Sequence, residues 1–278
     1  PLNPHTVNAR ICCRLNQLSS SDTGNKMKDI TIRDVPITFP FEPYPCQLDY
    51  MSKVVEALDN SSNALLESPT GTGKTLCLLA AALAWLEKKK PSPAMIGSGN
   101  TIQYDNGPNI KPIKPVAAPG QKAPASSIII YASRTHSQIS QVISELRASG
   151  YTPKMTVMGS REQLCIHEKI SKLKGAALNH ACSASGAQRK CTYKNNLETY
   201  TSATGILDIE ELAELGRDDQ VCPYFLSRQN VTSAELILLP YNYLIDASIR
   251  ATLKVEWNDA IVILDEAHNL EKVASDAS

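Results

Sequence analysis

The sequence predicts an α/β protein in which a mostly parallel sheet is covered by helices on both faces. Three observations point to this fold class. Short apolar or β-branched runs alternate with amphipathic helical patterns, a glycine-rich turn joins one run to a long apolar helix, and another run ends in two carboxylates. Residues 160–225 depart from this pattern and contain isolated cysteines. We therefore expect one α/β domain interrupted by a small insert domain.

The composition is that of a folded globular protein, with 42% hydrophobic and 20% charged residues over 278 positions. Lys plus Arg equals Asp plus Glu, 28 each, so the net charge does not indicate a nucleic-acid partner, and any such surface must be local. No apolar run reaches 18 residues, which predicts no membrane partner. Because residues 1–26 lack a secretory pattern, we expect the eight cysteines to be thiols or metal ligands rather than disulfides.

Residues 27–159 contain the first part of the α/β domain. The pattern predicts, in order, a helix with its apolar face at Leu48, Met51, Val54, Val55 and Leu58, a short buried strand over Asn63–Glu67, a helix over Lys74–Glu87, a strand over Ser127–Ala132, a helix ending at Gly150 and a strand over Met155–Met158. Residues 88–126 are rich in Pro, Gly, Ser and Lys and predict a flexible insert. Residues 1–26 are polar and without period, so we expect a disordered extension.

The insert domain covers residues 160–225, with a basic first part and an acidic second part. Strand patterns return at Leu236–Leu239 and Ala260–Leu264. Residues 226–278 therefore form the second part of the α/β domain.

The turn between the strand at Asn63–Glu67 and the following helix has the pattern of a phosphate-binding loop. It consists of Ser68, Pro69, Thr70, Gly71, Thr72, Gly73, Lys74 and Thr75. The glycines allow backbone N–H groups and the helix N-terminus to point at phosphate oxygens. Lys74 supplies a positive charge, and the Thr75 hydroxyl can ligate Mg²⁺. The strict pattern begins with glycine, so Ser68 is a departure from it.

The strand at Ala260–Leu264 runs directly into Asp265 and Glu266. Ligands of open parallel sheets bind at the carboxyl ends of the strands, so Asp265 is expected beside the phosphate-binding loop. There it would hold Mg²⁺, while Glu266 orients or deprotonates the attacking water.

Two further segments are candidate DNA contacts. The strand-to-helix turn at Ser133, Arg134 and Thr135 offers hydroxyls, free N–H groups and one charge to a phosphate, and Thr135 also suits a helix cap. Tyr241 and Tyr243 either stack on unpaired bases or are buried in the core.

Four cysteines of the insert, Cys165, Cys182, Cys191 and Cys222, are separated by 17, 9 and 31 positions. This is not the paired arrangement of a zinc ribbon. Thiolates suit zinc or an iron–sulfur cluster, and the spacing alone does not separate the two. A basic stretch in the same segment is either a phosphate-facing edge or a solvated face, and it contains Lys169, Lys172, Lys174, Arg189, Lys190 and Lys194.

The residues from Asp265 to His268 read Asp-Glu-Ala-His, which resembles motif II of the superfamily 2 helicases. The segments Gly159–His167 and Val221–Arg228 resemble the iron–sulfur branch of that superfamily, which includes the xeroderma pigmentosum group D and Fanconi anaemia group J helicases. Within this branch the chain is most similar to the telomere-elongation-regulator group, from about Met27 onward. The resemblance implies a RecA-like domain of the P-loop NTPase class, with a [4Fe–4S] cluster in the insert.

The same resemblance implies roles for individual residues and for the whole protein. Gln47 would read the adenine edge, and His268 would link the phosphate site to the DNA-binding motifs. The segment with Ser133, Arg134 and Thr135 would grip the DNA backbone, and the four cysteines would ligate the cluster at the point where the duplex is split. The implied activity is ATP- and Mg²⁺-dependent 5′ to 3′ unwinding of DNA on single-stranded, fork or loop substrates. The implied setting is the nucleus, in DNA repair, recombination control and telomere maintenance.

Motors of this family need a second RecA-like domain, so we expect the 278 residues alone to bind nucleotide weakly and to hydrolyse it poorly. Two alternatives remain open from the sequence. One is a P-loop ATPase unrelated to DNA with a structural zinc site, and the other is a non-catalytic binding or regulatory fragment.

Overall fold

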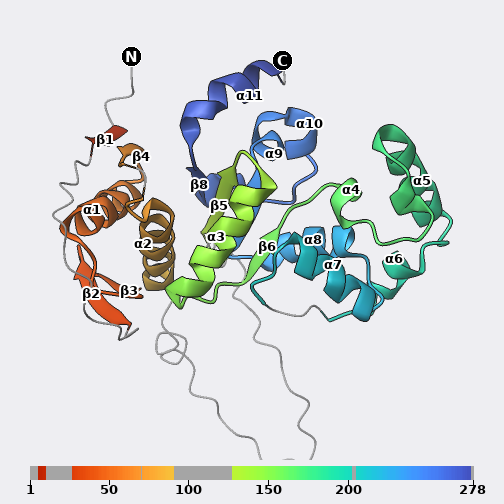
Figure 1. Ribbon diagram of the computed structural model, residues 1–278, viewed down its shortest axis with the longest axis horizontal. Helices are drawn as coiled ribbons and strands as arrows, with labels where there is room; N and C mark the ends of the chain where they lie inside the picture. The colour runs from red at the N-terminus through yellow and green to blue at the C-terminus, as the bar shows by residue number, and fades with distance from the viewer. Residues whose placement is uncertain (1–5, 11–26, 70, 91–126, 202–204, 277–278) are drawn as a thin grey trace, which may run out of the picture.

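The computed structural model describes residues 6–10, 27–69, 71–90, 127–201 and 205–276 (Figure 1). Most of the predicted extension (1–26) and most of the predicted flexible insert (88–126) lie outside the described residues.

A four-stranded parallel sheet forms the centre of the domain. Its strand order is β6-β7-β5-β8, where β5 is Ile128–Ser133, β6 is Met155–Val157, β7 is Leu236–Pro240 and β8 is Ala260–Leu264. Tyr131 of β5 is in register with Leu238 of β7 and with Ile263 of β8. All three neighbouring pairs are parallel, which confirms the predicted fold class.

The two faces of the sheet contribute to two different cores, as the alternation of side chains along a strand requires. Ile129 and Tyr131 belong to the core that contains α3, His136–Ser149. Ile128 and Ile130 belong to the core on the opposite face. The elements that follow β7 and β8 surround this second core: α9 (Asn242–Ile245), α10 (Ala247–Arg250), η4 (Trp257–Asp259), η5 (Ala267–Asn269) and α11 (Leu270–Asp276).

The segment before the sheet forms a helical layer with a hairpin. Strands β2 (Lys28–Ile32) and β3 (Val35–Phe39) pair antiparallel, and their two-residue turn holds Arg33 and Asp34 at positive φ. The long helix α2, Lys74–Lys89, packs against α1 (Pro45–Asp59), β3 and α3. Every residue of α2 from Leu79 to Leu86 is buried, so this helix is the centre of the layer.

The strand before the phosphate-binding loop differs from its prediction. β4 covers Asn63–Glu67 as expected, but four of its five residues are exposed, and Leu65 is 50% exposed. The prediction of a buried strand was wrong, because β4 hydrogen-bonds with β1 (Thr6–Arg10) and not with the four-stranded sheet. The same pairing corrects the expectation of a disordered extension for residues 6–10. These residues form strand β1, which pairs in parallel with the edge of β4.

The insert domain is helical in its described part and lies on the opposite side of the sheet from β1–β4 (Figure 1). Its elements are α4 (Arg161–Leu164), η2 (Ile170–Lys172), α5 (Gly175–Ala187), α6 (Thr192–Asn196), α7 (Ile209–Asp218) and α8 (Pro223–Asn230), and η3 (Val231–Ser233) leads back to the sheet. Arg147 of α3 contacts the Glu211 carboxylate and donates to the Ile206 carbonyl oxygen at 2.7 Å. These contacts tie the insert to the helix that follows β5. Across the described segments, no helix combines the length and the apolar character needed to cross a membrane.

Candidate active site and cysteine site

The phosphate-binding loop has the backbone that its sequence requires. Gly71 and Gly73 take φ values of +80° and +72°, a left-handed conformation that glycine adopts without strain. Helix α2 begins at Lys74, so its N-terminus faces the loop. The Lys74 ammonium donates to the Ser68 carbonyl oxygen at 3.0 Å. Thr70 lies outside the described residues, and Pro69 is exposed beside it.

The serine at the first position of the loop is part of its structure. The Ser68 and Thr72 hydroxyls lie 2.7 Å apart, and the Thr72 hydroxyl also donates to the Pro69 carbonyl oxygen at 2.9 Å. A glycine at position 68 would lack the first of these contacts. The departure from the strict pattern is therefore compatible with a closed loop.

Gln47 connects the start of α1 to the phosphate-binding loop. Its side chain is 3% exposed, its Oε1 accepts from the Tyr44 N–H at 2.9 Å, and its Nε2 donates to the Thr72 carbonyl oxygen at 3.1 Å. A Cβ at Gly73 would lie 3.0 Å from the same Nε2. Gln47 therefore braces the loop, which the sequence alone did not indicate, and its role at an adenine stays a prediction.

Replacing Gln47 by alanine is expected to lower the free energy of unfolding by about 1–3 kcal/mol, because a buried side chain with two part-buried hydrogen bonds, to the Tyr44 N–H and the Thr72 carbonyl, is lost. Chemical denaturation measures the effect. Gln229→Ala is the matched control, because Gln229 is exposed on α8. Equal stabilities for the two variants would contradict the bracing role.

Thr75, Asp265 and Tyr131 lie close together at the carboxyl end of the sheet. The Asp265 N–H donates to the Ala132 carbonyl oxygen at 2.9 Å, which fixes the start of the acidic loop beside β5. Burial raises the pKa of the half-buried Asp265 carboxyl, the Tyr131 hydroxyl lowers it, Glu266 raises it and the Lys74 charge lowers it. Lys74 is thus near enough to Asp265 to act on its ionisation.

Tyr131 is a member of this group that the sequence did not reveal. Burial raises its pKa most, the Asp265 charge raises it further, and the Thr75 hydroxyl lowers it. The Tyr131 hydroxyl is buried without a hydrogen bond of good geometry, although Thr75 and Asp265 are close enough to influence it. A hydroxyl, a carboxylate and an incompletely bonded phenol are oxygen donors that suit a hydrated Mg²⁺. The donor set fits a magnesium–triphosphate.

The residues after Asp265 form a tight turn. Glu266 has φ +52°, and its carboxylate lies 3.1 Å from Nδ1 of His268, whose side chain is 70% exposed. Asn269 accepts from Nη1 of Arg134 at 3.4 Å. The turn that carries Arg134 therefore touches the acidic loop directly.

Of the three predicted DNA contacts in that turn, one is not at the surface. Ser133 is fully buried as the last residue of β5, and its hydroxyl donates to Oε1 of Gln138 at 3.0 Å. The prediction of a DNA contact by the Ser133 side chain is therefore wrong. Thr135 is exposed and caps α3 by accepting from the Gln138 N–H at 3.3 Å. Arg134 is exposed, as a contact to DNA would require, and its role there stays a prediction.

His136, the first residue of α3, is half-buried, and its Nδ1 is buried without a hydrogen-bond partner. Burial lowers its pKa below the ordinary value of 6.5, against an opposing effect of Glu210. As the pH falls, His136 is therefore protonated in the unfolded chain before it is protonated in the folded protein. Its neutral form contributes fully to the free energy of unfolding above pH 6.5, and this contribution is lost as the pH falls below that value. We expect the melting temperature of the wild type to fall more steeply from about pH 7 to about pH 5.5 than that of His136→Gln. Parallel slopes would contradict this.

Tyr241 and Tyr243 are 1% and 5% exposed and belong to the core on the second face of the sheet. Of the two alternatives for these tyrosines, the structure therefore supports the buried one. Base stacking on them is excluded in this conformation, because a π-face must be accessible for a base to lie on it.

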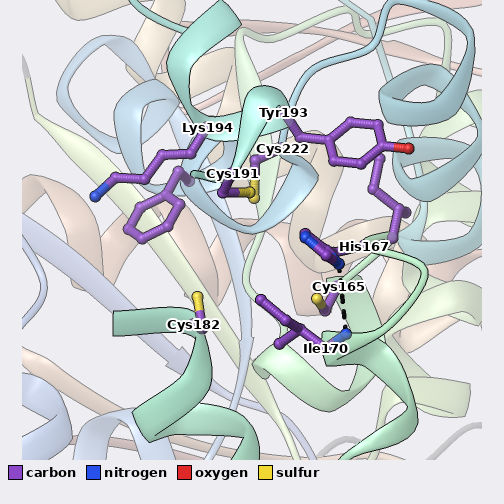
Figure 2. Close-up of a pocket in the computed structure, with 10 residues that line it drawn as sticks. Cys165, His167, Ile170, Cys182, Cys191, Tyr193, Lys194 and Cys222 are labelled. Carbon is purple, nitrogen blue, oxygen red and sulfur yellow. Dashed lines mark hydrogen bonds between the residues drawn. The ribbon is translucent and has the colours of Figure 1, made fainter. Parts of the chain in front are cut away.

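The four cysteines of the insert come together in space. Figure 2 shows Cys165, Cys182, Cys191 and Cys222 around one cavity, which His167, Ile166, Ile170, Tyr193, Lys194 and Phe225 also line. All four are free thiols. The described residues contain no group of three or more His, Cys, Asp or Glu side chains that is arranged to hold a metal ion.

Burial and the backbone have opposite effects on the thiols of this cavity, and burial has the larger effect. Burial raises the pKa of the Cys222 thiol to about 11, while N–H groups of Phe225 and Tyr224, at the start of α8, lower it. Burial also raises the pKa of Cys165, and the His167 backbone N–H lowers it. Cys182 and Cys191 raise the pKa of both thiols, which places the four sulfur atoms within electrostatic reach of one another. Four clustered cysteines with backbone N–H groups directed at two of the sulfur atoms are a donor set that fits a metal group bound by thiolates.

The basic stretch is divided between internal contacts and solvent. Arg189 pairs with Glu198 at 2.8 Å, and the Lys194 ammonium lies 4.8 Å from the centre of the Phe225 ring. Lys169, Lys172 and Lys174 are exposed. The phosphate-facing role of this stretch stays a prediction.

A parallel sheet with a glycine-rich loop, a catalytic-type lysine and an acidic strand end defines a P-loop nucleotide-binding protein. The DEAD_2 family model matches residues 131–278, more than half of the chain, and the DEAD/DEAH box helicase model matches residues 45–181. The chain belongs to the DEAD_2 family, which confirms the resemblance drawn from the motifs.

Relatives and a solved structure agree with this assignment. The chain is 44% identical over 266 residues to the regulator of telomere elongation helicase 1 of Bos taurus, 43% identical over 267 residues to that of Homo sapiens, and 42% identical over 272 residues to the homologue of Arabidopsis thaliana. These matches cover 91%, 91% and 93% of this chain but 22%, 22% and 25% of the relatives, so the chain spans about a quarter of their length or less. A solved XPD helicase shares the fold with a TM-score of 0.54 at 20% identity, over 84% of this chain and 34% of that one.

Proposed function

We propose that this chain forms the ATP-binding part of a DNA helicase. The observation that supports this most is the meeting of two segments about 190 residues apart: Thr75 and Asp265 both act on the buried Tyr131 hydroxyl, and Lys74 acts on Asp265. Neither a structural P-loop nor an isolated acidic turn requires that convergence. ATP hydrolysis in this family requires it.

The nucleotide chemistry follows from the positions of these side chains. The loop from Ser68 to Thr75 would surround the phosphates, with Lys74 on the phosphate oxygens. Thr75 and Asp265 would hold Mg²⁺, which neutralises charge on the phosphates when it is bound. Glu266, held beside His268, would orient the attacking water and accept its proton. The contribution of the protein is therefore positioning and electrostatic stabilisation.

The DNA-facing side of the proposal rests on Arg134 and Thr135. Both are exposed at the N-terminus of α3, where free N–H groups favour a phosphate. The contact of Arg134 with Asn269 provides a direct path from this turn to the acidic loop. A phosphate that binds Arg134 would compete for that contact, so occupancy of the DNA site would alter the loop that carries Glu266 and His268.

We propose a [4Fe–4S] cluster, rather than zinc, for Cys165, Cys182, Cys191 and Cys222. Thiolates around one zinc ion lie about 2.3 Å from it, whereas a cluster separates its ligands more widely. The cavity that all four cysteines line, and the resemblance of the flanking segments to the iron–sulfur branch, support the cluster. The group would brace the insert, because its ligands come from four separate parts of it.

The cellular role is proposed from the relatives. The names of these relatives state regulation of telomere elongation and helicase activity. We propose nuclear DNA repair, recombination control and telomere maintenance for the protein that contains this chain, with forks and loops among its substrates and 5′ to 3′ translocation.

Strand displacement tests this function directly, with the chain in its natural full-length context. A duplex with a 5′ single-stranded tail is expected to be unwound in the presence of Mg–ATP, and a duplex with only a 3′ tail is not. Iron analysis of the same protein distinguishes the alternative ATPase, since a colourless, zinc-loaded protein without strand displacement would support that reading instead.

Arg134→Ala is expected to weaken binding of single-stranded DNA and to reduce the salt dependence of binding by about one unit of slope, as the loss of one phosphate contact does. Fluorescence anisotropy at several salt concentrations measures both quantities. Arg217→Ala is the matched control, because Arg217 lies on α7, away from this turn. An unchanged slope for Arg134→Ala would remove this residue from the DNA surface.

A further inference from the structure

One polar side chain of the cysteine cavity has no role in the proposed function. His167 follows Cys165 by two residues, is partly buried, and lines the same cavity as the four cysteines. Figure 2 shows its ring beside Cys165, at the rim of the space that the sulfur atoms surround. The other non-cysteine residues of that cavity are mainly apolar or aromatic.

Hydrogen bonds fix the orientation of this ring. Its Nδ1 accepts from the backbone N–H groups of Lys169 at 3.2 Å and Ile170 at 3.4 Å. A nitrogen that accepts hydrogen bonds is not protonated in the neutral ring, so Nε2 carries the proton. Tyr193 packs edge-on against the ring, with the centroids 6.4 Å apart. The ring is therefore held from two sides with a defined tautomer.

The protonated nitrogen is directed away from the backbone that holds the ring. In Figure 2 the bond to Ile170 leaves one edge of the ring, and the second nitrogen points toward the space between the cysteines. Among the described residues, no oxygen or nitrogen acceptor bonds to Nε2. Most of the possible hydrogen-bond acceptors that line this cavity are the four cysteine sulfur atoms. A group bound by these cysteines would add further acceptors. The backbone N–H of the same residue already interacts with the Cys165 sulfur.

We propose that His167 donates a hydrogen bond from Nε2 to a sulfur atom of the cluster and thereby sets its reduction potential. The inference rests on the proposed iron–sulfur cluster. A one-electron reduction adds negative charge to the cluster without forming or breaking a bond in the protein, and a donor aimed at sulfur stabilises the reduced form more than the oxidised form. His167 is thus a positioning residue that raises the potential. It is not a ligand.

The experiment is a dye-mediated reductive titration of the anaerobically purified chain, followed by absorbance and by electron paramagnetic resonance. His167→Phe keeps a ring but removes the donor, and we expect its equilibrium constant for reduction to fall by about tenfold, equivalent to ~59 mV for one electron. His167→Gln keeps an N–H donor and is expected to recover part of that loss. His180→Gln is the matched control, because His180 also lies two residues from a cysteine but is exposed and does not line the cavity.

A second measurement needs no variant and so does not depend on folding of a mutant. In the wild type with ¹⁵N-labelled histidine, pulsed electron paramagnetic resonance of the reduced cluster should detect one weakly coupled histidine nitrogen and an exchangeable proton. A strong coupling would identify His167 as an iron ligand, and the absence of any coupling would place its ring elsewhere. Either result overturns the inference.

The possible outcomes distinguish the role of His167 from the presence of the iron–sulfur cluster on which it depends. Wild-type protein that contains iron, with identical potentials for wild type and His167→Phe, overturns only the role of His167. Wild-type protein without iron overturns the cluster itself, and the proposal for His167 with it.

Discussion

Lys74→Ala is expected to weaken the binding of Mg–ATP by roughly tenfold to a hundredfold, because a charge-assisted hydrogen bond to a phosphate contributes about 1.5–3 kcal/mol. In the structure the ammonium is already held inside the loop by the Ser68 carbonyl oxygen, so it reaches the phosphates without a search through many rotamers. The effect on turnover is expected to be at least as large, since the charge on the phosphates grows during transfer.

Fluorescence titration with a labelled ATP analogue measures this change. Lys88→Ala is the matched control, because Lys88 is an exposed lysine in the last turn of the same helix, far along the chain from the loop. Circular dichroism should show the same helix content in both variants. Equal affinities for the two variants would mean that the loop does not bind the triphosphate, and the proposed function would fail with it.

Cys222→Ser is expected to reduce the iron content from roughly four atoms per chain to nearly none and to loosen the insert. Cys222 is the most buried of the four cysteines and occupies the N-terminus of α8, which packs on β6 and α7. Loss of the bound group would leave a buried polar side chain facing the other three thiols. The helices of the insert would then depend on the apolar core that they share with the rest of the domain, to which Leu164, Leu197 and Leu212 belong.

Iron analysis, visible absorbance and limited proteolysis follow the two parts of this prediction. Cys46→Ser is the control, because Cys46 is a partly buried free thiol on α1, outside the insert. Full iron content in Cys222→Ser would show that this residue is not a ligand. Iron loss in Cys46→Ser would show that the cluster responds to general instability.

The sequence predicted those elements whose signal is local. β5, β7 and β8 were found at nearly their observed bounds because each is an apolar run between turns. The end of α3 at Gly150 was found because glycine takes the left-handed conformation there, with φ +78°. The position of Asp265 at the carboxyl end of a parallel strand likewise predicted that it lies beside the phosphate-binding loop.

The errors concern properties that depend on distant partners. The exposure of β4 depends on which strand lies beside it, and no pattern within Asn63–Glu67 states that. Tyr131 and His167 were missed for the same reason: one is an inward residue of an apolar strand, and the other is a histidine in an irregular loop. Their chemistry arises only when the fold places Thr75 and Asp265, or three further cysteines, around them.

Helix α3 contributes to two regions of the molecule, one at each of its ends. Its first turn follows directly from Arg134 and Thr135, and its last turn carries Arg147, which contacts Glu211 and Ile206 of the insert. Fourteen helical residues make a rod about 21 Å long that transmits force with little bending. A displacement of one end of this helix would therefore move the other end with it. The turn that carries Arg134 and the insert that carries the four cysteines thus share one straight element.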